Sequence, residues 1–155
     1  MTFRIHALPA EAFAGLFSLS DTDLARHNAR RQIVQSHPGT PCRVSLADAE
    51  VGETVILVNY EHLPTGSPYR SSHAIFVREG AAEARPDIGE VPEVLRSRLI
   101  SVRFFDGNDM MIDADVVPGD RLAEAITEGF RTPDIAYAHL HNAKPGCYAA
   151  KVTRA

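Results

Sequence analysis

Cysteine is scarce in this chain, since Cys42 and Cys147 are the two present among 155 residues. Two thiols are too few for a zinc ribbon or for the disulfide framework of a small secreted domain. No apolar run approaches the length needed to cross a bilayer, and residues 1–6 lack the apolar core of a signal peptide. We therefore expect a soluble cytoplasmic protein without a membrane partner, in which both thiols stay reduced and unpaired.

An excess of positive charge is also missing. The formal net charge is −4, which gives no general attraction to nucleic acid, so we expect no nucleic-acid partner. The sequence contains no Gly-x-Ser-x-Gly, Walker or dinucleotide fingerprint. Nothing in it therefore identifies a cofactor or favours a hydrolase over a transferase.

The length and the absence of repeats and linkers predict one domain over residues 1–155. Residues 54–60 form the most apolar run and predict an interior strand, which pairs antiparallel with residues 71–78. Residues 99–105 and 110–117 flank Asp-Gly-Asn-Asp and predict a hairpin. With helices predicted after Pro9, after Ser20 and Pro92, and over residues 120–130, the chain is an α+β domain with a mostly antiparallel sheet and three or four helices.

The stretch from Ala138 to Ala149 gathers more groups able to bind or react than any other. His139 and His141 are two residues apart, so on a strand they share a face and can offer two imidazoles to one metal ion. A pair supplies half of a tetrahedral shell, and hydrogen bonding at a sheet surface is the alternative.

The turn after this strand decides where the neighbouring groups point. If residues 143–146 form a four-residue loop, Asn142 faces Cys147 and Tyr148 joins the histidines. A loop one residue longer on one side swaps these faces.

A second polar stretch follows the long interruption at residues 61–70. There His73 alternates with Ile75 and Val77 on a strand and requires a partner if it is half buried. The simplest arrangement brings this strand close to the terminal hairpin, where one pocket would hold both stretches. His73 or His141 would transfer protons and Cys147 would act as a nucleophile. The ligand-binding residues would be Arg70, which can hold an anion through its planar fork, together with Ser72, Arg43, Asn142 and Tyr69.

Three segments carry a family resemblance: Pro41 to Leu46 (PCRVSL), Pro68 to Val77 (PYRSSHAIFV) and His141 to Ala149 (HNAKPGCYA). Together they resemble the bacterial family catalogued as domain of unknown function 1203, and the resemblance extends over nearly the whole chain. It implies a single domain and assigns no catalytic role to any residue.

Three functions remain open at this point. The first is binding of a small anionic molecule in a His/Arg/Cys-lined pocket, with or without catalysis. The second is a structural or protein-interaction domain in which the cysteines fill the core and the arginines pair with acids. The third is metal binding by His73, His139 and His141. The sequence leaves the oligomeric state open.

Overall fold

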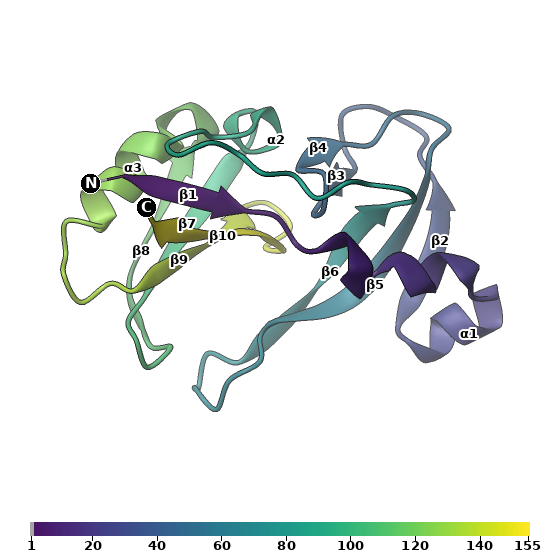
Figure 1. Ribbon diagram of the computed structural model, residues 1–155, viewed down its shortest axis with the longest axis horizontal. Helices are drawn as coiled ribbons and strands as arrows, with labels where there is room; N and C mark the ends of the chain where they lie inside the picture. Colours follow the sequence, from purple (N-terminus) through teal and green to yellow (C-terminus); the bar gives the residue numbers. More distant parts are fainter. Residues whose placement is uncertain (1) are drawn as a thin grey trace.

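A computed structural model describes residues 2–155. Its strands form two five-stranded sheets that lie side by side (Figure 1). The predicted α+β class is therefore confirmed, whereas the expectation of one sheet is wrong. The long connection after residue 78 leads the chain from one sheet to the other, so the hairpin at residues 99–118 starts a separate set of pairings.

The first sheet is antiparallel throughout and holds both ends of the described chain. Its strand order is β1 (Phe3–His6), β10 (Tyr148–Arg154), β9 (Tyr137–Asn142), β7 (Leu99–Phe105) and β8 (Met111–Pro118). The predicted β7–β8 hairpin and the terminal hairpin of β9 and β10 are both present.

The second sheet has the order β2 (Ala29–Ile33), β5 (Thr54–Leu63), β6 (Ser71–Arg78), β3 (Pro41–Cys42) and β4 (Ala47–Asp48). The apolar run predicted to be an interior strand lies in β5, between β2 and β6, and pairs antiparallel with β6 as expected. β5 continues to Leu63 past a bulge between Tyr60 and Leu63. The first residues of the interruption expected at residues 61–70 are therefore strand.

The helices predicted after Pro9 and over residues 120–130 are shorter in the structure than the sequence pattern predicts. The α-helices of residues 2–155 are α1 (Asp21–Arg26), α2 (Glu93–Arg96) and α3 (Leu122–Gly129), and the 3₁₀ segments are η1 (Ala10–Ala12), η2 (Ala14–Ser18) and η3 (Gly119–Arg121). The helix expected after Pro9 is thus two 3₁₀ turns. At α1 the Ser20 Oγ accepts a hydrogen bond from the Asp23 N–H and so caps the helix expected after Ser20.

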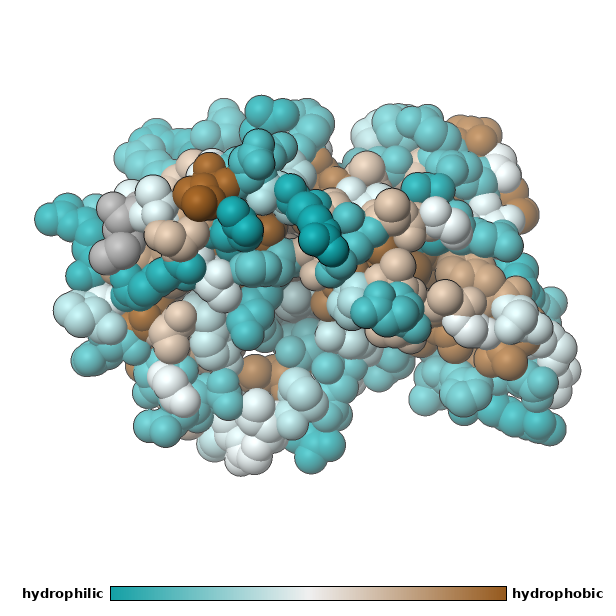
Figure 2. Space-filling model, viewed as in Figure 1, coloured by the Kyte–Doolittle hydropathy of each residue, from teal (hydrophilic) through white to brown (hydrophobic). Residues whose placement is uncertain are grey.

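Each sheet has its own apolar core. In the first, Leu122, Ile126 and Phe130 from the α3 region pack on the apolar face of β7, β9 and β10. In the second, residues of the segment between β1 and α1 pack against β5 and β6. Figure 2 shows a largely hydrophilic surface, on which hydrophobic side chains gather mainly over this second half.

Polar contacts join the two sheets. The Arg43 guanidinium follows β3 in the chain and its Nε donates to the carbonyl oxygen of Tyr148 in β10 at 2.8 Å. Arg98, which precedes β7, makes two hydrogen bonds to the Asp48 carboxylate in β4, at 2.6 and 2.9 Å. These contacts connect the strands of one sheet to the strands of the other.

Candidate functional site

Strand alternation sends four histidines to the space between the sheets. In β9, Ala138 and Leu140 enter the first apolar core, so His139 and His141 point to the opposite face. His62 in β5 and His73 in β6 meet them there from the second sheet, with ring centroids 5.5 Å apart for His62 and His139 and 5.1 Å apart for His73 and His141. In each pair, one histidine comes from the first sheet and the other from the second. The cluster therefore depends on how the two sheets pack together.

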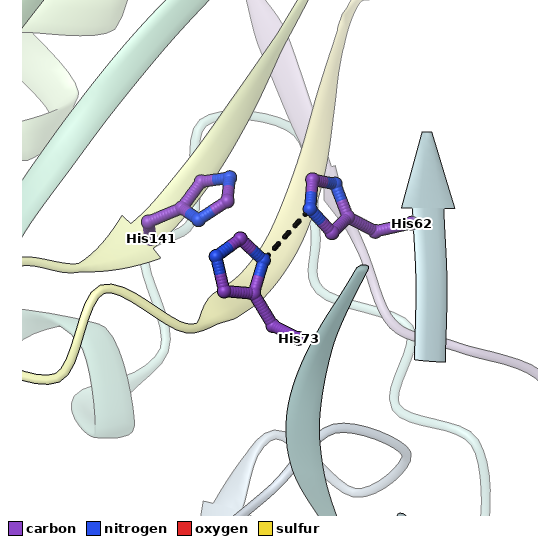
Figure 3. Close-up of side chains that lie close together, drawn as sticks. All are labelled: His62, His73 and His141. Atoms are coloured by element: carbon purple, nitrogen blue, oxygen red, sulfur yellow. Dashed lines mark hydrogen bonds between the residues drawn. The ribbon is translucent and has the colours of Figure 1, made fainter. Parts of the chain in front are cut away.

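Three of these rings converge on one point. His62, His73 and His141 each offer a ring nitrogen, and these three atoms lie within 4.8 Å of one another. Figure 3 shows the three imidazoles turned toward one another, with a hydrogen bond of 2.8 Å between His73 Nδ1 and His62 Nε2.

The hydrogen bonds of His141 fix which of its nitrogens is free. Its Nδ1 lies 3.0 Å from the carbonyl oxygen of Gly146, which can only accept, so Nδ1 carries the proton. Nε2 then carries the lone pair, and this atom is buried without a hydrogen-bond partner in the described chain. A buried lone pair that no donor satisfies is what a metal ligand presents before the ion binds.

His62 has a matching arrangement through His139. The Nδ1 atoms of these two rings lie 3.4 Å apart, so a proton on His62 Nδ1 can be donated to His139 Nδ1. In that tautomer His62 Nε2 carries the lone pair and accepts hydrogen bonds from His73 Nδ1 at 2.8 Å and from the Ser71 hydroxyl at 3.1 Å. His139 is thus placed to orient His62.

The environment keeps these imidazoles neutral. Burial lowers the pKa of His62 to about 4 and the pKa of His139 and His141 to about 3, and the nearby Arg103 cation adds to each shift. Burial, followed by the charge of Arg103, also lowers the pKa of His73. Neutral imidazole is the form that coordinates a metal ion.

The spacing of the three nitrogens fits a tetrahedral ion after a small adjustment. With metal–nitrogen bonds of about 2.0–2.1 Å, two ligand nitrogens in a tetrahedral shell lie about 3.3 Å apart. The His62–His73 contact would open by about half an ångström, and His141 would move inward. Three histidines leave the fourth position for water or another ligand, and a metal ion there can lower the pKa of a bound water or polarise a carbonyl or phosphoryl oxygen.

Two clefts have histidines of the cluster in their walls. The larger, of ≈ 560 Å³, is lined by His73 and by Arg43, Asn142, Lys144 and Cys147. The smaller, of ≈ 310 Å³, is lined by His62 and His139 together with Tyr60, Tyr137, Asp109 and Lys151. Small molecules can therefore approach the histidines without unfolding either sheet.

Arg43 forms the inner wall of the larger cleft. Its side chain is fully buried, with the residue 2% exposed, and donates to the carbonyl oxygens of Tyr148 and Pro41 and to the Sγ of Cys147 at 3.0 Å. No carboxylate of residues 2–155 forms an ion pair with it. Burial lowers its pKa, although the neighbouring Cys147 opposes that shift. Beside it, Asn142 Oδ1 is buried without a hydrogen-bond partner among the described residues.

The structure brings together some of the residues predicted from sequence and separates others. His73 and His141 share the cluster, and Arg43, Asn142 and Cys147 line the cleft that reaches His73. Three predicted ligand-binding residues lie elsewhere: Arg70, an exposed residue paired with Glu61 at 3.2 Å, and the exposed Tyr69 and Ser72.

The predicted turn geometry is resolved by the register of the last hairpin. Tyr148 pairs with His141, so its ring joins the histidines and stacks on His62 with centroids 5.0 Å apart. Cys147 is paired with Asn142 through a backbone hydrogen bond, as a four-residue loop requires. Both cysteines are free thiols, as expected.

His62 is absent from the candidates that the sequence pattern predicts, in which His139 is the third metal ligand. His62 lies near the end of β5, within the interruption expected at residues 61–70. The sequence does contain a pattern that predicts its position. Ile56, Val58, Tyr60 and His62 alternate along one strand face, so His62 shares that face.

Comparison with known proteins gives one match. The model of the family described as Protein of unknown function (DUF1203) matches residues 39–154, which include the four histidines and Arg43. Neither the curated proteins nor the solved structures contain a match to the chain. Within residues 2–155, no helix has the length and apolar character required to span a membrane. On the extent of the family match, this chain belongs to the DUF1203 family.

Proposed function

We propose that this protein binds a first-row transition-metal ion through His62, His73 and His141. The observation that carries the proposal is the buried Nε2 of His141, which has no hydrogen-bond partner in the described chain and belongs to a group of three ring nitrogens within 4.8 Å. An all-imidazole ligand set suits zinc, copper, iron or nickel rather than magnesium or calcium.

Metal content of the untagged protein tests this proposal. After treatment with a chelator and dialysis against zinc, mass spectrometry of the metal should give one zinc ion for each chain. Cobalt in place of zinc should give the visible absorption bands of a tetrahedral site. A stoichiometry near zero, with the protein folded, would overturn the proposal.

Substitutions locate the ion. His62→Gln, His73→Gln and His141→Gln should each lower the affinity for zinc at least tenfold. His27→Gln is the matched control, because His27 is exposed and lies outside the cluster. Equal loss in the control would place the bound zinc elsewhere on the protein.

A second candidate is binding of a small anionic molecule in the larger cleft. The buried guanidinium of Arg43 has no ion-pair partner among residues 2–155, and it lines the larger cleft together with a second cation, Lys144. Since Arg43 also joins the sheets, Lys144→Gln at the cleft wall is the cleaner test. It should weaken the binding of inorganic phosphate measured by calorimetry, and unchanged binding would count against this candidate.

Catalysis in the cleft would use the same groups. Cys147, half buried beside Arg43, would supply a nucleophile, and His73 would lie where both the cleft and the histidine cluster are in reach. A cytoplasmic location for a single domain agrees with the free thiols and is part of this proposal.

A further inference from the structure

Arg103 lies beside the histidine cluster on the same face of the first sheet. In β7 it is the register partner of His139, and Ser101, two residues earlier, is the partner of His141. Residues two apart on a strand share a face, so Arg103 and Ser101 point with the histidines toward the second sheet. The Arg103 Nε donates to Ser101 Oγ at 3.2 Å, which directs the guanidinium along the strand toward His141.

Arg103 differs from most arginines of this chain in having no acidic partner. Arg98 pairs with Asp48, Arg78 with Glu53, and Arg70 with Glu61. No carboxylate of residues 2–155 lies within ion-pair distance of Arg103, which is only partly exposed. Among the described residues, the guanidinium of Arg103 therefore has a hydrogen bond to Ser101 but no ion pair.

A metal ion in the cluster would increase this imbalance. The three proposed ligands are neutral rings, and the remaining charged side chains whose fields act on His73 are Arg103 and Arg43, both cations. A divalent ion would add two positive charges to three neutral ligands, and the Asp109 carboxylate in the smaller cleft already accepts a hydrogen bond from the Tyr137 hydroxyl. Unlike charges attract strongly where solvent is partly excluded, so this site favours an anion as its fourth ligand.

We infer that the exchangeable ligand of the metal centre is a small oxyanion, a carboxylate or a phosphate, with one oxygen on the metal and another held by Arg103. A guanidinium makes charge-assisted hydrogen bonds to the remaining oxygen of a carboxylate, and its planar fork can hold two of the remaining oxygens of a phosphate. This inference rests on the metal site proposed above, and it assigns a ligand class and a recognition residue to that site.

Titration of the cobalt-loaded protein tests the inference. Acetate, inorganic phosphate and chloride are added separately, and the change in the visible spectrum gives a dissociation constant for each. Acetate and phosphate should both bind. Arg103→Gln should raise the dissociation constants of acetate and phosphate at least tenfold while the cobalt stoichiometry stays at one. The dissociation constant of chloride, which has a single donor atom, should rise less.

Arg121→Gln is the matched control, because it removes the same charge from an exposed arginine that pairs with Glu124. If Arg103→Gln does not fold, Arg103→Lys decides instead: it keeps the charge without the fork and should still weaken the oxyanions more than chloride. Unchanged oxyanion affinity in the folded variant, or equal loss in the control, would overturn the inference. No oxyanion binding by the cobalt-loaded wild type would also overturn it, and failure to load cobalt would instead refute the metal site itself.

Discussion

Acid should destabilise the metal-free protein at a pH well above the one at which carboxylates protonate. Burial lowers the pKa of His62 to about 4 and the pKa of His139 and His141 to about 3. In the unfolded chain each pKa returns to about 6.5. Below that pH the unfolded state binds more protons than the folded state, so the free energy of unfolding falls as the pH falls.

The magnitude follows from the same pKa values. A buried histidine that stays neutral loses about 1 kcal/mol of its stabilising contribution between pH 7 and pH 5.5. For the three histidines together, the free energy of unfolding falls by about 3–4 kcal/mol over this pH range. The total free energy of unfolding of a typical domain is about 5–15 kcal/mol. The loss would continue down to the folded pKa values of about 3–4.

Urea unfolding followed by circular dichroism measures this effect. The titrations are run in a chelator at pH 7, 6.5, 6 and 5.5, and the midpoint should fall steadily while the urea dependence of the free energy stays constant. His139→Asn should reduce the total loss by about 1 kcal/mol, because one titrating group is removed. A free energy of unfolding that is constant or rises between pH 7 and pH 5.5 would refute the reasoning.

Two further predictions concern packing and thiol access. Gly129→Ala should destabilise the protein by about 1–3 kcal/mol, because the added Cβ would lie 2.2 Å from Cζ of Phe104, whereas Gly15→Ala meets no heavy atom within 4 Å and should change stability by less than about 0.5 kcal/mol. Thermal unfolding of the two variants compares them directly, and equal stabilities would contradict the packing argument. Iodoacetamide should label Cys147 in the cleft faster than the buried Cys42, and peptide mass spectrometry showing equal rates in the folded protein would exclude this difference in access.

Local sequence pattern predicted the strands that carry the site, but not the way they combine. Alternation placed His73 with Ile75 and Val77, and it placed His139 with His141, as the structure confirms. The two sheets were missed because which strands pair depends on contacts between residues far apart in the chain. A hydrogen bond such as that from Arg43 to the Tyr148 carbonyl oxygen joins residues 105 positions apart, so the local sequence pattern does not predict it.

The same alternation explains the residues that were placed in the site and lie outside it. Ser72 stands one position from His73, so a strand that turns His73 inward turns Ser72 outward. Arg70 precedes the strand and pairs with Glu61 across the loop, which satisfies its charge locally. Both residues are predicted to bind a ligand because they are close to His73 in the sequence. Strand alternation turns Ser72 away from the cluster, and the nearby Glu61 pairs with Arg70.

The energetic cost of the cluster supports a role beyond packing. A buried nitrogen without a partner, as His141 Nε2 has, costs about 1–3 kcal/mol relative to an apolar side chain of the same shape. Four neutral imidazoles lower stability further as the pH falls, and apolar rings in their place would carry neither penalty. The proposed metal ion would satisfy the lone pairs and would join His62 and His73 of one sheet to His141 of the other. It would stabilise the folded state by about 2.7 kcal/mol when its free concentration is a hundred times the dissociation constant, which would offset the cost of burying these imidazoles.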